Sequence, residues 1–283
     1  MAKISNEAKR KYFQRITSYK KTIERLTDKE TQVEKTLKDS DPDRPYKLIE
    51  LSEDNLTVIS IYNIINSLSL VILGIKNESA LNDARKTCYK AIIHLEHVFT
   101  NYIDVPFSEY SEALQSAAKI PEFKRYELIR KIGFSIDQVR DALGENSRWK
   151  YSLVELDSRL AILARNNINL RTIIEGMDPR VEGYRIRIEF LNLTIRMLEN
   201  AAVSYRKKYE LSTGRMDDFK TAINYLSAQR RLASTLGRID EAAELKRKID
   251  IWREKMENDD KNKTEKERQQ RLQQLKNPNE STV

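Results

Sequence analysis

The side chains best suited to acid–base or metal chemistry are the two histidines, His94 and His97, which lie three residues apart around Glu96. That spacing lets two imidazoles on one helix share a metal ion. No cysteine, histidine or carboxylate cluster in the sequence completes such a ligand set, and no Glu-x-x-His motif occurs. We therefore expect packing or surface roles for both histidines and predict no metal site.

Cys88 is the single cysteine, and a cysteine is a nucleophile only where its surroundings favour the thiolate. It falls on the apolar face of a predicted helix, where cysteine acts as a small hydrophobic residue. The sequence also lacks a Gly-rich phosphate loop, a strand–loop–helix unit for a dinucleotide and a Gly-x-Ser-x-Gly elbow. We therefore predict a protein that is not an enzyme, with no catalytic residues, no cofactor and no small-molecule substrate.

The distribution of apolar residues predicts the fold. The chain has seven glycines and six prolines in 283 residues, and every proline lies outside the long apolar-periodic stretches. Proline inside a helix costs about 3 kcal/mol, so this distribution favours helices throughout. We predict an all-α fold: an elongated multi-helix bundle with long antiparallel coiled-coil-like helical hairpins. A lone cysteine and an N-terminus without an apolar signal region predict a cytoplasmic protein.

Residues 48–144 are expected to form a helical bundle around a central helix at 54–75. Leu56–Ile75, LTVISIYNIINSLSLVILGI, carries no formal charge and is long enough to cross a membrane. A spanning helix would place Asn63 and Asn66 in hydrocarbon, whereas a bundle offers them hydrogen-bond partners. We favour the core-helix interpretation and keep membrane association as an alternative.

Residues 1–38 are predicted to form a basic, coiled-coil-like helix in which Glu30 fills one position of an apolar seam. Eleven of its residues are lysine or arginine and five are acidic, so most of the net charge of +8 lies here. The helix is either a solvated face beside a seam or a basic arm for an acidic partner, nucleic acid or anionic lipid. The residues expected to bind a partner or phosphate are Lys9, Arg10, Lys11, Arg15, Lys20, Lys21 and Arg25.

Residues 146–212 are predicted to form a long antiparallel helical hairpin, with each helix more than roughly 40 Å long at about 1.5 Å per residue. Asn167 takes one position of its seam, and a polar seam residue can fix register or oligomeric state. The predicted bundle or oligomer seam comprises Trp149, Leu153, Leu156, Leu160, Leu163, Asn167, Ile188, Leu191, Ile195 and Leu198.

Residues 215–257 are predicted to form a C-terminal helical hairpin. Its segment GRIDEAAELKRKI, Gly237–Ile249, resembles the second helix of a tetratricopeptide repeat, with Gly237 at the turn and Ala242 as the small inward residue. Arg230 and Ile249 stand where that family favours small residues, and no second copy follows at a 34-residue period. A generic hairpin therefore remains favoured. Residues 258–283 are charged, with little to bury, and are expected to be a frayed helix or disordered.

These features favour a non-enzymatic helical scaffold or protein–protein interaction protein, which binds another protein or self-associates. Nucleic-acid binding through the first helix is one alternative, which Arg206–Lys208 or Lys246–Lys248 would extend. Attachment to an anionic membrane, through the apolar run or the basic helix, is the other.

Overall fold

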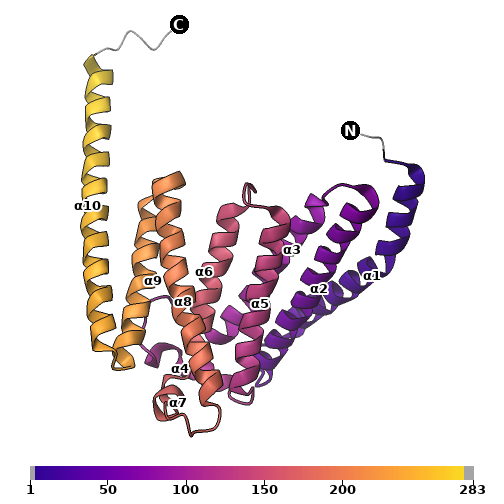
Figure 1. The fold of residues 1–283 in the computed structure, drawn as a ribbon, viewed down its shortest axis with the longest axis horizontal. Helices are drawn as coiled ribbons and strands as arrows, with labels where there is room; N and C mark the ends of the chain where they lie inside the picture. Colours follow the sequence, from indigo (N-terminus) through magenta and orange to yellow (C-terminus); the bar gives the residue numbers. More distant parts are fainter. Residues whose placement is uncertain (1–3, 277–283) are drawn as a thin grey trace. The chain divides into compact units, whose positions relative to one another are not determined.

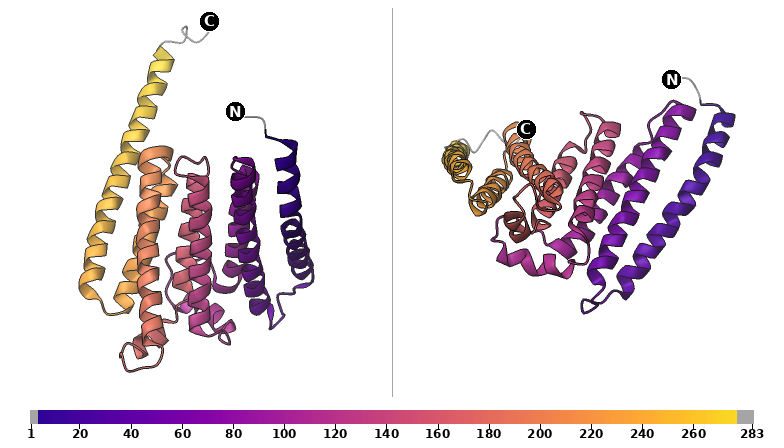
Figure 2. Two further views of the ribbon diagram at one scale, coloured as in Figure 1. Left: turned by 45° about the vertical axis from the view of Figure 1, so that its right-hand side comes forward. Right: turned by 60° about the horizontal axis from the view of Figure 1, so that its bottom comes forward.

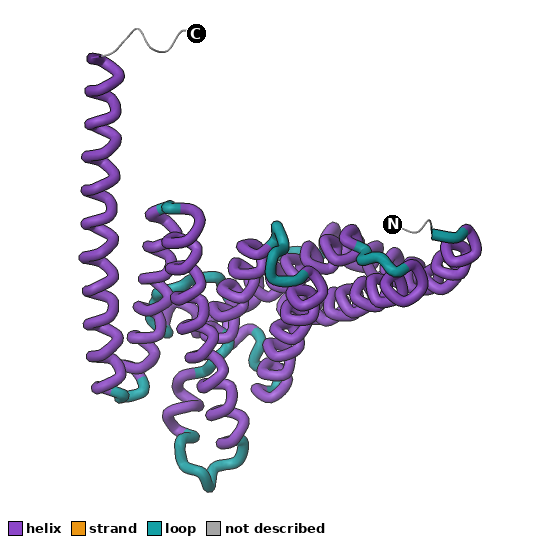
Figure 3. Tube along the Cα trace, turned by 45° about the horizontal axis from the view of Figure 1, so that its top comes forward, coloured by secondary structure: helices purple, strands orange, loops and turns teal. Residues whose placement is uncertain are grey.

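The computed structural model describes residues 4–276, with side chains described as far as residue 269. Every regular element in this range is a helix, as Figure 3 shows, so the all-α prediction is confirmed. The chain divides into two compact units, residues 1–198 and 199–283.

The first unit opens with three successive antiparallel helices, α1 (Asn6–Thr36), α2 (Arg44–Leu73) and α3 (Glu78–Phe99), which lie side by side in Figure 1. Their ends follow local chemistry. The Ser5 hydroxyl accepts a hydrogen bond from the third residue of α1, and the Asn77 side chain caps α3 in the same way. Gly74 ends α2 in the left-handed conformation that glycine adopts without strain.

α2, the predicted central helix, and α3 pack extensively against each other. α3 also packs against α4, α5 and α6, and its inward side chains, from Leu81 to Phe99, are buried. α2 is apolar on several sides, and its neighbours α1, α3 and α5 leave part of it uncovered. Apolar composition alone therefore does not reveal which side of α2 is covered.

α4 (Ser108–Ser116), α5 (Glu122–Leu143), α6 (Lys150–Asn166) and α7 (Leu170–Glu175) follow. α5 and α6 pack against each other and against α3. Gly133 of α5 lies at this crossing, since a Cβ atom there would stand 3.6 Å from a Leu160 methyl group. The close crossing accounts for a glycine in the middle of a helix.

The structure differs from the expected hairpin at 146–212, because the first of its two helices is interrupted. Its first helix, α6, ends at Asn166 instead of continuing to Ile174, and Asn169 caps the separate helix α7. Asn166 donates hydrogen bonds to Thr100, and Arg165 donates to backbone carbonyls of the loop after α3. These contacts compete with helix continuation. The next helix, α8 (Tyr184–Lys208), begins later than the expected start at Pro179.

The second unit contains the end of α8, a short π-helix η1 (Tyr209–Thr213), α9 (Met216–Thr235) and α10 (Ile239–Lys276). α9 and α10 form the predicted hairpin, joined through Gly237, and the left view in Figure 2 shows α10 extending beyond α9. α10 is helical through 258–276, where a frayed or disordered tail was expected. Residues 277–283 of that predicted tail lie outside the described part of the chain.

Candidate functional site

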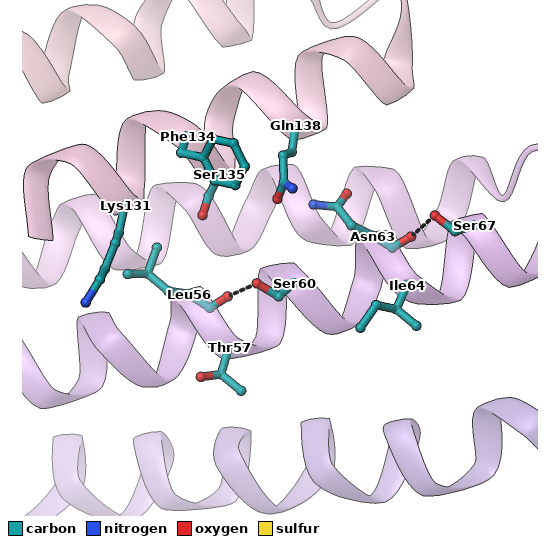
Figure 4. A pocket seen from close by; sticks show the side chains of 10 residues that line it. All are labelled: Leu56, Thr57, Ser60, Asn63, Ile64, Ser67, Lys131, Phe134, Ser135 and Gln138. Carbon is teal, nitrogen blue, oxygen red and sulfur yellow. Dashed lines mark hydrogen bonds between the residues drawn. The ribbon is translucent and has the colours of Figure 1, made fainter. Parts of the chain in front are cut away.

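A groove of about 530 Å³ lies between α2 and α5 in the first unit. Its side chains come from two neighbouring helices, and Figure 4 shows Phe134 and Gln138 of α5 opposite α2. Lys131 is the one charged residue among those that line it, so the groove offers no acid–base pair for catalysis. The lining residues are Leu56, Thr57, Ser60, Asn63, Ile64, Ser67, Lys131, Phe134, Ser135 and Gln138.

One exposed stripe of α2, which we name the α2 stripe, lines the groove and continues beyond it by one helical turn to Val71. It comprises Thr57, Ser60, Ile64, Ser67 and Val71. These positions recur at spacings of three and four, so they share one face of the helix. Val71 is 83% exposed and Phe134, across the groove, is 64% exposed. The stripe is thus an uncharged helix face with no covering helix among the described residues.

α2 also meets the length and hydropathy that crossing a membrane requires. Its most apolar window of 18 residues has a mean hydropathy of 1.9, and 33% of that window is buried. Core helices of soluble proteins are mostly buried, and this helix is not. The exposed remainder of the window contains much of the α2 stripe together with Leu70.

Two serine side chains of α2 in the groove bond to their own helix, whereas Asn63 does not. The hydroxyls of Ser60 and Ser67 donate hydrogen bonds of 3.0 Å to carbonyls one turn earlier, drawn as dashed lines in Figure 4. Both amide atoms of Asn63 are buried and have no hydrogen-bond partner. Asn66, one turn later, accepts a hydrogen bond from the Asn77 N–H. A core helix was expected to offer hydrogen-bond partners to both Asn63 and Asn66. Only Asn66 has such a partner, whereas Asn63 lines the groove without one.

All seven predicted partner-binding cations of α1 are exposed, and none forms an ion pair with another residue that the structure describes. They point in several directions. Lys20 lines a second cavity, between α1, α2 and the start of α3. Lys11 lies 18 residues before Lys29, which equals five helical turns, so both share one face of α1. Lys29 binds Glu50 and Asp54 of α2 at 2.6 and 2.7 Å. These ion pairs turn the face of α1 that carries Lys11 and Lys29 toward the side of α2 on which the α2 stripe lies.

We name this face the α1 rail. It comprises Lys11, Arg15, Ser18, Thr22, Arg25 and Lys29 at spacings of three and four residues. Three of the seven predicted cations, Lys11, Arg15 and Arg25, belong to it. Lys9, Arg10, Lys20 and Lys21 do not. The structure therefore brings only part of the predicted basic set to the side of the α2 stripe.

Glu30, the polar residue in the predicted α1 seam, is the centre of a buried network. Its carboxylate accepts hydrogen bonds from His94 Nε2 at 2.8 Å, Asn55 Nδ2 at 2.9 Å and the Lys90 ammonium. Burial by itself raises the pKa of the Glu30 carboxyl. The hydrogen bonds from His94, Lys90 and Asn55 outweigh that effect and lower the pKa to about 2. The network joins α1, α2 and α3, and His94 has a packing role.

Glu30, Glu34 and His94 also bring three possible metal-ligand atoms within 4.8 Å of one another. The donor set does not fit a metal ion in this arrangement. Lys90 already places a cation on one Glu30 oxygen, and His94 uses its Nε2 to bind the other. Cys88 is fully buried, and burial raises the pKa of its thiol to about 12, so it is a core residue as predicted.

The predicted seam residues are mostly interior, but they do not form one hairpin interface. The α6 members, including Leu156 and Leu163, are buried where α6 packs on α3 and α5. In α8, Leu191 and Leu198 are buried, and the ring of Phe190 packs at a tilt against Tyr126 of α5, with 5.3 Å between the ring centroids. Asn167 is completely buried at the end of α6, and neither of its amide atoms has a hydrogen-bond partner.

The basic clusters proposed to extend a phosphate-binding surface lie in the second unit. Arg206 pairs with Glu210 and stands 4.7 Å from the Trp252 ring. Lys208 binds Asp218 at 2.8 Å. These two cations thus stabilise the packing of their own unit.

The fold and the groove together define an all-α helical bundle with one uncovered, uncharged helix face. A sequence profile of the TP0443 family matches residues 8–260, and the chain belongs to that family. No curated protein and no solved structure matches the chain. The family name states no activity.

Sequence reasoning missed the groove itself. The signal was present in the α2 stripe, where uncharged residues recur with helical spacing for four turns. The same helix has apolar residues on other faces, which hid the face that would remain uncovered.

Proposed function

We propose that this protein is a non-enzymatic interaction protein that holds a helix of a protein partner on the α2 stripe. The observation that supports the proposal is the uncovered stripe itself. Ile64 and Val71 remain exposed on this helix, and Phe134 projects from α5 beside Ile64. Helix-in-groove recognition uses apolar anchors at this spacing.

The exposed polar lining favours a protein over a lipid bilayer. Thr57, Ser67 and Gln138 line the groove and are exposed, and a protein helix can offer hydrogen bonds to these side chains. Acyl chains cannot. Nucleic acid would use the cations of α1 but would gain little from exposed Ile64 and Val71. We therefore keep the protein partner as the proposed function.

Site-specific crosslinking in the native cell tests the proposal. A photoreactive residue replaces Ser67 in the α2 stripe of the full chain, and a matched variant carries it at Lys86, an exposed position of α3. We expect an adduct at Ser67 that is absent at Lys86 and whose digestion identifies a helical segment of the partner.

That segment is then produced and titrated against the purified full chain. We expect Ile64→Glu to weaken its binding at least about tenfold, since a charge would enter an apolar contact. Circular dichroism of the variant should match that of the wild type, because Ile64 is already partly exposed. Equal crosslinking at both positions, or equal binding by the Ile64→Glu variant, would refute the proposal.

A further inference from the structure

We infer that the partner helix is amphipathic and carries acidic residues along the flank that faces α1. This inference rests on the proposed function, because it specifies the chemistry of the helix held on the α2 stripe. It follows from the α1 rail, which runs beside an uncharged stripe.

The cations of the α1 rail lie on the side of α1 that borders the α2 stripe. Lys29 is anchored to Glu50 and Asp54 of α2, and helical spacing places Lys11 and Arg15 on the same side of α1 toward its N-terminus. Arg25 lies one turn before Lys29 on that side. A helix resting on the α2 stripe therefore has cations along one flank.

The acidic residues near this face do not neutralise the rail. Glu50 and Asp54 are occupied by Lys29, whereas Lys11, Arg15 and Arg25 have no ion pair within the described chain. Glu53 is the acidic residue nearest the N-terminal end of the α2 stripe, and Glu7 lies in the first turn of α1.

The α5 side of the groove carries both positive and negative side chains, unlike the basic α1 side. Lys131 lines it, and Asp141 follows on the same face of α5, so charges of both signs are present. Glu127, also on that face, pairs with Lys124 at 3.6 Å. The acidic preference therefore applies to one flank of the bound helix, which sets its orientation.

The same cations argue against a second copy of this chain docked antiparallel on the stripe. Two copies that met in that way would bring their α1 rails together, and like charges at close range oppose association. A bilayer would satisfy the cations but not the exposed polar side chains of Thr57, Ser67 and Gln138 in the groove. An acidic amphipathic helix satisfies the cations, the apolar anchors and these polar side chains together.

A displayed peptide library tests the inference. The peptides are alanine-based helices of about 18 residues, which match the α2 stripe at about 1.5 Å per residue. One face is varied among leucine, isoleucine, valine and asparagine, and both flanks are varied among glutamate, glutamine and lysine. The library is selected against the full chain, with the Ile64→Glu variant as the matched counter-target.

We expect the enriched peptides to carry glutamate on one flank and to bind about tenfold more tightly than versions with glutamine there. The Lys11→Glu/Arg15→Glu double variant should lose this preference while still binding the glutamine versions. High salt should also reduce the preference.

The outcomes separate the two proposals. Peptides enriched over the counter-target without acidic residues would overturn the inference and leave the proposed function standing. No enrichment over Ile64→Glu would overturn both. Binding of the full chain to phosphatidylserine vesicles or to duplex DNA that survives Ile64→Glu, with no peptide enriched, would assign the α1 rail to a membrane or nucleic acid instead.

Discussion

Glu30 of α1 and His94 of α3, which are 64 residues apart in the sequence, share a buried hydrogen bond of 2.8 Å. Lys90 and Asn55 bind the same carboxylate, so three helices meet at one acidic side chain. α1 is also held by the ion pairs of Lys29 with α2 and by an apolar contact in which Tyr12 and Ile16 pack on α2. Glu30 is therefore the buried polar anchor of the helix that carries the α1 rail.

Replacing Glu30 by glutamine should lower the free energy of unfolding of the first unit by about 2 kcal/mol, because its buried donors lose a charged acceptor. Each unit contains one tryptophan, Trp149 in the first and Trp252 in the second. During urea denaturation, the fluorescence of Trp149 in a Trp252→Phe protein therefore follows the first unit. The fluorescence of Trp252 in a Trp149→Phe protein follows the second.

The control for this variant is Glu34→Gln, since the Glu34 side chain is 55% exposed and 4.0 Å from His94. We expect a change below about 0.5 kcal/mol there. Equal losses in both variants would contradict the role assigned to Glu30.

Stability should also fall in acid through the same carboxylate. Its ordinary pKa of 4.5 applies to the unfolded chain, and the folded value is about 2. Between these values the unfolded state binds more protons, so the stabilisation by Glu30 is complete above the higher value and is lost as pH falls toward the lower. The full loss is about 3 kcal/mol. Denaturation of wild type and Glu30→Gln should diverge as pH rises from about 3 to about 6; parallel curves would contradict this origin.

Two asparagines one turn apart on α2 should respond oppositely to the same substitution. Asn63→Leu removes two buried, unpartnered amide atoms, and we expect the free protein to become more stable by about 1 kcal/mol. Asn66→Leu removes the acceptor for the Asn77 N–H and should cost about 2 kcal/mol. Thermal and urea denaturation measure both. A gain in stability from Asn66→Leu, or a loss from Asn63→Leu, would contradict the hydrogen bonding that the structure assigns to these two side chains.

Arg165 should be intolerant of change. Its buried guanidinium donates hydrogen bonds to the carbonyls of Tyr102, Ile103 and Val105 and lies 4.9 Å from the Tyr110 ring. Arg165→Met leaves those carbonyls unpaired, and we expect a loss of about 3 kcal/mol. Arg180→Met is the matched control, because the Arg180 side chain is 90% exposed. Urea denaturation that gave equal small losses would refute the role of Arg165.

The helices and many of their ends were predictable because local residues determine them. Ser5, Asn77 and Gly74 act through their own neighbours in the chain, and proline stays outside helix interiors. The break at Asn167 was not predictable, since apolar residues continue with the same spacing through Ile174. Contacts of Arg165 and Asn166 with a loop some 60 residues earlier cause it.

The candidate site likewise depends on contacts between helices, which local sequence patterns do not predict. The sequence identified the cations of α1 but not which of them face α2, because that depends on the ion pairs of Lys29. It identified Glu30 and His94 as separate polar residues within apolar stretches, and no periodicity links positions on different helices. The uncovered side of α2 depends on where α1 and α5 lie.

The open side of α2 also has a consequence for the supply of the protein in the cell. Under the proposed function, a partner that binds only the folded state would stabilise it by mass action, so copies made in excess of that partner would be less stable. Those copies would leave Val71 and Phe134 exposed. Their lifetime in the cell would then depend on how much of the partner is made.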